Sequence, residues 1–335
     1  MKYVVVDKKN AEETRRQLAE LGLIDNKYEV VKKGDKVFFP VKECPDGFEC
    51  VEMEGKPKQA KPKSLKEALS HMLTAEELDE LVTSFDIVGD IAIIQIPDRL
   101  ADKAREIGKA LMKVHPNVHV VCQKLGARKG IFRLAPLRVI AGEDRFTTTY
   151  KENGVRMKVD VLKAYFSPRL STERLRIAKQ VKDGETVAVF FAGVGPFALV
   201  IAKMKKVKVY AVELNPYAFS LMEENVRMNK LAGEIIPIQG DVRKVYKELP
   251  PCDRVVMPLP KGGEDFLDIA FKTVKPGGMI HFYQFAPEDN LYEDAINRIN
   301  KTAKDLGRRV EIVNKKIVRP HKPRVYQVVI DFKVF

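Results

Sequence analysis

The sequence predicts an α/β protein in which two small α+β modules precede a mostly parallel, doubly wound sheet that ends in an antiparallel hairpin. From about residue 171, short apolar strands alternate with amphipathic helices, the pattern of a parallel sheet covered on both faces. The last two apolar segments, 309–318 and 325–332, have no helix between them and predict a hairpin at the sheet edge. A chain of 335 residues exceeds what one ordinary core needs, so two or three domains are expected.

Residues 1–53 form the first expected module. Asn10 with Glu13 indicates a helix start, and Gly22 indicates its end. The expected elements are a strand at 3–6, a helix at 11–21 and a hairpin of 28–32 with 36–41. The segment 54–63 then carries Pro, Gly and Lys with almost nothing apolar, which predicts a linker.

Residues 64–165 form the second expected module, a mixed α+β unit. Ser64 with Glu67, and Thr74 with Glu77, have the spacing of capping boxes at two helix starts. The other expected elements are a pair of strands within 86–96, a helix at 101–114 and strands near 118–122 and 155–161.

Charge points to a polyanionic partner. The chain has 59 basic against 46 acidic residues, a formal net charge of +13, and phosphates favour clustered Lys and Arg through counterion release. Within the segment 128–145, basic residues interleave with Phe132, at Arg128, Lys129, Arg133, Arg138 and Arg145. This composition suits an RNA-facing surface. An exposed loop, or the charged surface of a heat-adapted protein, has the same composition and stays an alternative interpretation.

The sequence argues against a metal site and a membrane anchor. The four cysteines match neither a disulfide framework nor a metal knuckle and are expected to be reduced thiols: Cys44, Cys50, Cys122 and Cys252. His115 and His119 flank Pro116 and have no acidic or thiol partner nearby. Because no apolar run reaches the length of a membrane span, we expect a cytoplasmic protein, and we take it to be a monomer.

The third expected domain, 166–335, carries a candidate nucleotide-type cofactor site. The turn Phe191–Phe197 (FAGVGPF) lies between a strand and a helix, where glycines let the backbone approach a ligand. Glu213 ends the next strand, where a carboxylate can accept both hydroxyls of a ribose. Asp241 ends the third strand and can accept a hydrogen bond from an adenine amino group.

This order of glycine turn, acid and acid resembles the class I, Rossmann-like S-adenosylmethionine methyltransferases. A dinucleotide oxidoreductase is the competing interpretation, but Ala198 stands where its third glycine is expected. The chain departs from the methyltransferase pattern at Val189, where an acidic residue is usual. The predicted S-adenosylmethionine contacts are Phe191, Ala192, Gly193, Val194, Gly195, Glu213, Leu214, Asn215, Asp241 and Val242.

Together with VELNP, GDVR and the amino-terminal module, the segments YFSPR (165–169) and FAGVGPF are similar to the archaeal and eukaryotic tRNA guanine-37 N1-methyltransferases and their wyosine-pathway relatives. The resemblance spans essentially the whole chain. It implies that the first domain contacts the tRNA body, and that the other two enclose the anticodon stem-loop and a flipped base.

The resemblance also assigns catalytic roles. It makes Arg133 the cation beside the guanine carbonyl and Glu173 the general base. Guanine N1 carries a proton, so a carboxylate that removes it and a cation that stabilises charge on O6 both assist methylation. Both residues also have a structural interpretation, Glu173 as a helix-start carboxylate and Arg133 as a phosphate contact. The implied substrate contacts are Tyr165, Arg169, Arg174, Arg138 and Lys261.

One segment departs from the family pattern. After the fourth strand, single-activity members carry Asn-Leu-Pro-Lys, whereas this chain has Pro258-Leu259-Pro260-Lys261. Proline cannot supply the side-chain amide that orients the base. We therefore place Pro258 and Pro260 in the catalytic pocket and expect the bifunctional archaeal type, which methylates guanine N1 and also C7 of a tricyclic wyosine intermediate. Transfer of an aminocarboxypropyl group, a non-catalytic tRNA-binding role and a small-molecule methyltransferase are the alternatives.

Overall fold

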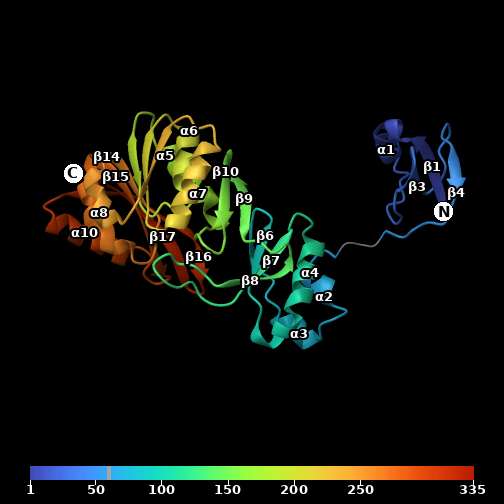
Figure 1. Cartoon of the computed structure of the whole chain (residues 1–335), viewed down its shortest axis with the longest axis horizontal. Helices are drawn as coiled ribbons and strands as arrows, with labels where there is room; N and C mark the ends of the chain where they lie inside the picture. The colour runs from blue at the N-terminus through green and yellow to red at the C-terminus, as the bar shows by residue number, and fades with distance from the viewer. Residues whose placement is uncertain (59–61) are drawn as a thin grey trace. The chain divides into compact units, whose positions relative to one another are not determined.

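A computed structural model describes residues 1–58 and 62–335, and the chain divides into two compact units, Met1–Pro62 and Lys63–Phe335 (Figure 1). Residues 59–61 of the expected linker lie outside the described part of the chain. Each unit has its own hydrophobic core. No helix among the described residues has the length and apolarity needed to cross a membrane.

The first unit is a four-stranded antiparallel sheet in the order β2-β3-β1-β4, with helix α1 packed on it. Its elements are β1 (Lys2–Asp7), η1 (Lys8–Asn10), α1 (Ala11–Glu20), β2 (Val31–Lys33), β3 (Lys36–Val41) and β4 (Cys50–Glu52). Val4, Leu18 and Phe39 form the centre of its core. The expected strand, helix and hairpin are all present. Strand β4 was not predicted, because a strand of three residues is too short to give a recognisable sequence pattern.

The structure contradicts the expectation of four reduced thiols. Cys44 and Cys50 form a disulfide, with their Cα atoms 6.2 Å apart. The loop before β4 folds back, so that two residues six apart in sequence come within bonding range, which spacing alone did not indicate. Cys122 and Cys252 are free thiols, as expected; both are buried, and burial raises the pKa of each thiol to about 12.

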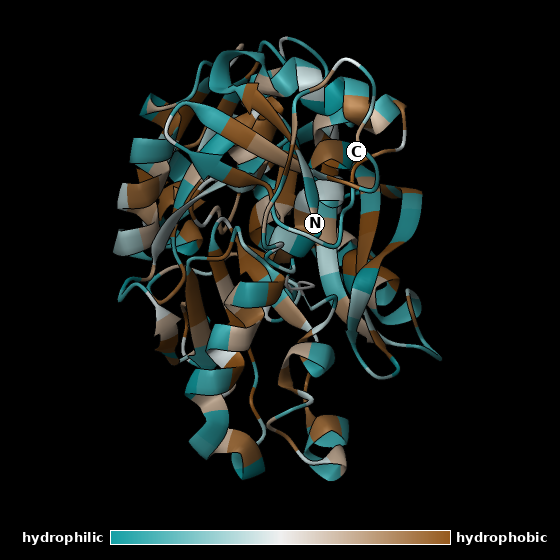
Figure 2. Cartoon of the chain, turned by 90° about the vertical axis from the view of Figure 1, so that its right-hand side faces the viewer, coloured by the Kyte–Doolittle hydropathy of each residue, from teal (hydrophilic) through white to brown (hydrophobic). Residues whose placement is uncertain are grey.

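The second unit begins with a four-stranded sheet in the order β5-β6-β7-β8, covered by helices. Its elements are α2 (Leu65–Leu69), α3 (Ala75–Glu80), β5 (Phe85–Val88), β6 (Ile91–Ile94), η2 (Asp98–Lys103), α4 (Ala104–Val114), β7 (Val120–Lys124) and β8 (Leu137–Gly142). Thr74 forms the expected capping box with Glu77, and Ser64 caps α2. Helix α4 buries Ile107 and Leu111 against this sheet, and Figure 2 shows apolar and polar segments alternating along the helices of the chain.

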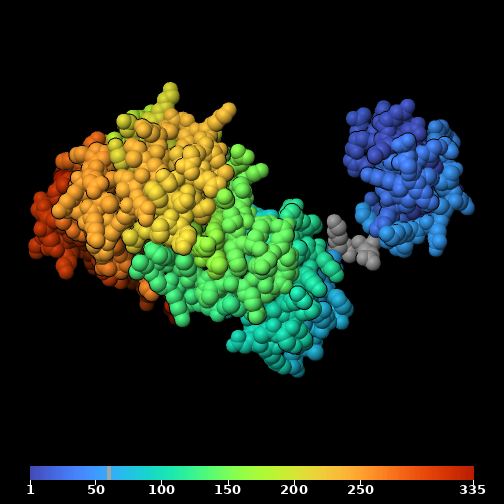
Figure 3. Space-filling view, viewed as in Figure 1, coloured from blue at the N-terminus to red at the C-terminus, as the bar shows by residue number. Residues whose placement is uncertain are grey.

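The hairpin of β9 (Thr147–Glu152) and β10 (Val155–Asp160) joins this sheet to the larger one. Val155, Met157 and Val159 of β10 lie in the core of the larger sheet. Asn225 of α7 donates to the carbonyl of Lys158 at 3.1 Å and accepts from its N–H at 2.6 Å. The segments 63–165 and 166–335 therefore pack as one continuous body, visible in Figure 3 from teal through red.

The large sheet has seven strands in the order β13-β12-β11-β14-β15-β17-β16. The first five are parallel, and β17 runs antiparallel to both of its neighbours. Its strands are β11 (Thr186–Val189), β12 (Lys208–Glu213), β13 (Glu234–Gln239), β14 (Cys252–Met257), β15 (Val274–Pro287), β16 (Val310–Lys322) and β17 (Val325–Val334). The predicted fold class, with its antiparallel carboxyl-terminal hairpin, is confirmed.

Helices cover both faces of this sheet. They are η3 (Pro168–Leu170), α5 (Ser171–Gln180), α6 (Pro196–Met204), α7 (Pro216–Arg227), α8 (Val242–Val245), η4 (Tyr246–Glu248), η5 (Gly263–Phe266), α9 (Leu267–Thr273) and α10 (Glu293–Asp305). Because side chains alternate along a strand, Val187 and Val189 face α5, α6 and α7, while Ala188 faces α8, α9 and α10. Because β11, β12 and β13 are parallel, their carboxyl ends lie at the same edge of the sheet.

Candidate active site

The glycine turn after β11 leads directly into α6. Phe191, Gly193 and Gly195 have φ values of 55°, 59° and 88°, so three of five turn residues are left-handed. A Cβ on Gly195 would lie 2.9 Å from Cγ of Met222, and the turn can therefore close only with glycine there. Left-handed backbone at a non-glycine residue such as Phe191 is strained and typical of functional sites.

Glu213, at the end of β12, holds this turn. Its carboxylate accepts the N–H of Gly193 at 2.6 Å and the N–H of Asn215 at 2.7 Å. Burial raises the pKa of Glu213, and the N–H donors of Asn215, Gly193 and Leu214 oppose that rise. The predicted neighbours of Glu213 are thus brought together, with Leu214 exposed beside them.

Asn215 connects the cofactor turn to the segment that precedes Tyr165. Its side chain caps α7 by accepting from the N–H of Tyr217 at 3.1 Å, and it donates to the carbonyl of Lys163 at 2.7 Å. A Cβ on Gly193 would lie 3.6 Å from the carbonyl oxygen of Tyr165. The glycine turn therefore faces the YFSPR segment directly.

Asp241 follows β13 and caps α8, because its carboxylate accepts the N–H of Arg243 at 2.9 Å. The Val242 side chain is buried in the core. Two residues that the sequence did not single out lie next to the turn: the Phe266 ring packs edge-on against Phe191 at 4.8 Å, and the Arg243 guanidinium lies 3.8 Å from the Phe266 ring centre. Arg243 directly follows the predicted Asp241 and Val242, which was the available signal.

These groups fit S-adenosylmethionine. The strand-end carboxylates of Glu213 and Asp241 can accept hydrogen bonds from a ribose and an adenine. The Phe191 ring can pack on the nucleoside, and the glycines of the turn let the protein backbone approach the ligand closely. Among residues 1–58 and 62–335 there is no cluster of three His, Cys, Asp or Glu side chains that could hold a metal ion.

A cavity of about 350 Å³ lies between β5, β6 and the segment around Tyr165. Five cations line it, together with one acidic side chain, Asp86, and His321. The cations are Lys124, Arg128, Arg133, Arg169 and Arg319. Arg169 pairs with Asp86 at 2.5 Å, and the remaining excess of positive charge suits an anionic ligand.

Aromatic and half-buried polar groups shape the same cavity. The Arg128 guanidinium lies 4.8 Å from the ring centre of Tyr165. Arg319 on β16 donates to Gln327 at 2.9 Å, and burial beside Arg169 and Arg128 lowers its pKa. Arg319 and His321 were missed, although the run KKIVRPHKPR at 315–324 is rich in basic residues, as is the segment 128–145.

Arg133 connects the middle sheet to the loop after β14. Its guanidinium donates to the carbonyl of Lys261, and its backbone is left-handed with φ of 54°. Pro260 of the same loop accepts the N–H of Phe285 at 2.9 Å, and Pro258 is half-buried at the strand end. Arg133 thus contacts, through Lys261, the loop that carries Pro258 and Pro260.

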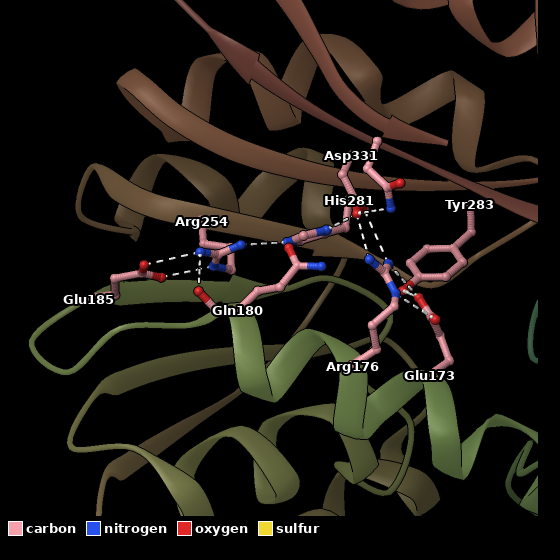
Figure 4. A network of polar contacts seen from close by, with 9 residues as sticks. Glu173, Arg176, Gln180, Glu185, Arg254, His281, Tyr283 and Asp331 are labelled. Carbon is pink, nitrogen blue, oxygen red and sulfur yellow. Dashed lines mark hydrogen bonds and ion pairs between the residues drawn. The ribbon is translucent and has the colours of Figure 1, made fainter. Parts of the chain in front are cut away.

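Glu173 is not among the residues that line this cavity. Its side chain is buried, and its carboxylate accepts hydrogen bonds from the Tyr283 hydroxyl at 2.6 Å and from two nitrogens of Arg176 at 2.7 and 2.8 Å (Figure 4). Neither Tyr283 nor Arg176 was singled out in the sequence. Burial and the adjacent Glu173 raise the pKa of the Tyr283 hydroxyl.

Two predicted substrate contacts lie elsewhere. The Arg174 guanidinium is 1% exposed and is bound to Glu152 at 2.5 and 2.6 Å and to the carbonyl of Ser167. These are the contacts of a structural residue. Arg138 is exposed on β8 and donates to Gln123 at 2.8 Å, outside the cavity lining.

Comparison with known families gives three matches. A model described as the TRM5/TYW2 methyltransferase domain matches residues 148–313. One described as the TYW2 N-terminal domain matches 65–145, and one described as the tRNA methyltransferase 5 N-terminal domain matches 4–49.

Individual relatives are similar over most or all of the chain. The tRNA (guanine(37)-N(1))-methyltransferase Trm5b of Pyrococcus abyssi is 42% identical over 332 residues, which cover 99% of this chain and 98% of the relative. The structure of an aTrm5–tRNALeu complex has a TM-score of 0.76 at 37% identity and covers 99% of both chains. The tRNA (guanine(37)-N(1))/4-demethylwyosine(37)-methyltransferase Taw22 of Nanoarchaeum equitans is 33% identical over 299 residues, covering 74% of this chain and 98% of the relative.

Proposed function

Because the chain belongs to the TRM5/TYW2 family of S-adenosylmethionine-dependent methyltransferases, we propose that it methylates position 37 of tRNA. It acts on N1 of guanosine and, as a second activity, on C7 of the tricyclic wyosine intermediate. Similarity to position-37 methyltransferases over 98% or more of the chain supports the first activity. The protein acts as a monomer in the cytoplasm, and its first unit, Met1–Pro62, contacts the tRNA body.

The observation that carries the proposal is the position of a cationic cavity beside the cofactor turn. Tyr165 lines the cavity, and its carbonyl oxygen faces Gly193 of the turn. Asn215 fastens the intervening segment by donating to Lys163. A base drawn into this cavity therefore lies next to the cofactor, while the surrounding cations hold the phosphates of its strand.

Arg133 and Glu173 divide the chemical work. When bound, S-adenosylmethionine would supply an electrophilic methyl group for transfer to guanine N1. Glu173 removes the N1 proton, and Arg133 stabilises the negative charge that develops on O6. The Glu173 carboxylate accepts hydrogen bonds from Tyr283 and Arg176 at Oε1 and from Arg176 at Oε2, so Oε2 retains an acceptor site for the N–H of guanine N1.

The second activity rests on Pro258. A proline at this position offers neither a side-chain amide nor a backbone N–H, so the loop after β14 gives a bound base no hydrogen-bond donor there. A tricyclic base that attacks through carbon gains more from space and stacking than from an amide clamp. The similarity to a relative named for both reactions supports this activity.

Mass analysis of nucleosides tests the proposal. The full chain is incubated with S-adenosylmethionine and two tRNAs, one with unmodified guanosine-37 and one with the tricyclic intermediate. A methyl group gained on both supports both activities, and a gain on guanosine alone removes the second. An aminocarboxypropyl mass on the tricyclic base would replace the second activity with the alternative group transfer. Binding of tRNA without any product would leave a non-catalytic role.

A further inference from the structure

A chain of buried charged groups extends from Glu173 into the large sheet (Figure 4). Arg176, one turn further along α5, donates to Glu173 and also to Asp331 of β17, at 2.6 and 3.2 Å. Asp331 is 1% exposed and also accepts from Asn314 of β16 at 3.1 Å. Arg176 is therefore shared between two carboxylates on different elements.

His281 of β15 continues the chain in a fixed tautomer. Its Nδ1 lies 2.6 Å from an oxygen of Asp331, and its Nε2 lies 2.7 Å from a guanidinium nitrogen of Arg254. Arginine has no acceptor, so Nε2 must carry the lone pair and Nδ1 the hydrogen. His281 is neutral in this arrangement, and burial lowers its pKa.

Arg254 is the last member of this buried row of charged groups and forms a second ion pair. It donates to both oxygens of Glu185, at 2.8 and 3.0 Å, and to the carbonyl of Gln180. With His281 neutral, the three carboxylates and two guanidiniums sum to one negative charge. The titratable groups that face Glu173 and Asp331 come from α5 (Arg176), β14 (Arg254) and β15 (His281 and Tyr283).

We propose that Asp331 is a positioning residue for Glu173: through Arg176 it fixes the carboxylate and shares the positive charge that Arg176 presents to it. The inference rests on the proposed role of Glu173 as the base. A positive charge next to a carboxylate favours its ionised form and so makes it a weaker proton acceptor. Because Asp331 offsets part of the Arg176 charge, Glu173 is a more effective proton acceptor than it would be beside Arg176 alone. Hydrogen bonds at both ends of Arg176 also restrict the rotation of Glu173.

The test compares three variants of the full chain: Asp331→Asn, Glu173→Gln and Glu152→Gln. The last is the matched control, because Glu152 also forms a buried bidentate pair with an arginine, Arg174, but has no hydrogen bond to this chain of groups. Methylation of guanosine-37 is followed from pH 5 to 9 at saturating substrates. KM for tRNA and the thermal unfolding midpoint are measured alongside.

Asp331→Asn is expected to lower kcat on the order of three- to tenfold and to move the acid limb of the kcat profile to lower pH, with KM for tRNA unchanged. Glu152→Gln is expected to lower the unfolding midpoint without moving that limb. An Asp331→Asn enzyme with wild-type kcat and an unmoved limb would overturn the proposal. If this variant does not fold, Arg176→Lys decides, since lysine has three donors and cannot form the four hydrogen bonds that Arg176 makes to the two carboxylates. An unchanged kcat profile there overturns the proposal as well.

Glu173→Gln separates this inference from the proposed function. Its expected loss in kcat is about 100-fold or more, the scale of general-base catalysis. Wild-type turnover in Glu173→Gln would remove both the base and its positioning by Asp331 while leaving guanosine-37 methylation intact. A wild-type protein that forms no product would instead refute the function itself.

Discussion

The carboxylate of Glu213 accepts the backbone N–H of Gly193 at 2.6 Å, so the end of β12 is fastened to the turn that follows β11. One half-buried acid thus shapes the glycine turn, and it is also the acceptor we propose for a ribose. Since a protonated carboxyl cannot accept both ribose hydroxyls, this proposed contact makes cofactor binding depend on the ionisation of Glu213.

We expect the affinity for S-adenosylmethionine to fall as pH drops from 7 into the weakly acidic range. Burial raises the pKa of Glu213, so protonation begins at a higher pH than for an exposed glutamate. Calorimetric titration between pH 4.5 and 7.5 measures this. Glu213→Gln should lower the affinity about tenfold or more and remove the acidic decline. Glu234→Gln, at the opposite end of β13, should behave as wild type, and a wild-type affinity that stays constant down to pH 5 would contradict the assignment.

Gly195 and Gly184 form a matched pair for testing the turn. Their φ values are 88° and 84°, but a Cβ on Gly195 meets Met222 at 2.9 Å, whereas one on Gly184 meets nothing within 4 Å. Both alanine variants should lose about 1 kcal/mol of unfolding free energy from the backbone alone. Gly195→Ala should lose on the order of 1–3 kcal/mol more and bind S-adenosylmethionine more weakly. Equal losses in the two variants would show that the Met222 contact does not matter.

Replacing Arg319 by Gln should weaken tRNA binding and reduce the slope of log affinity against log salt by about one, the effect of one lost phosphate contact. The reason is its place among the cations of the cavity that Tyr165 lines. Filter binding at several salt concentrations measures both quantities. Arg227→Gln, exposed on α7 outside the cavity, is the control. A slope that does not change in Arg319→Gln would place the phosphates elsewhere.

Pro258→Asn should shift the product ratio toward N1-methylated guanosine. An asparagine restores the amide that can orient guanine, while it takes apolar space from the tricyclic base. The yields of the two products are compared by nucleoside mass analysis, with Pro251→Asn before β14 as the control for general loosening. If the ratio is the same in Pro258→Asn and wild type, this proline does not set the choice of base.

Features that depend on local order along the chain could be predicted. Glu213 and Asp241 were found because parallel strands end at a common edge, so their order in sequence gives their place in the site. By contrast, Arg319 and Tyr283 reach their positions through pairing of β15, β16 and β17, and a one-residue change of register would turn them away.

Some contacts of α5, the helix that carries Glu173, also could not be predicted from the sequence. Arg174, its neighbour in sequence, points to Glu152, whereas Arg176, three residues on, shares its face and binds it. Helical spacing identifies Arg176 as a partner, but the sequence alone does not show that Asp331 lies on the other side. The Cys44–Cys50 pairing was likewise missed because it depends on the path of one loop.

The most direct measurement supplies S-adenosylmethionine with a labelled methyl group and two transcripts of one tRNA that differ only in guanosine or adenosine at position 37. If the protein methylates N1 of guanosine-37, the guanosine transcript gains one labelled methyl per tRNA, recovered as N1-methylguanosine, and the adenosine transcript gains none. Equal labelling of both transcripts, or labelling of neither, would contradict the proposed function.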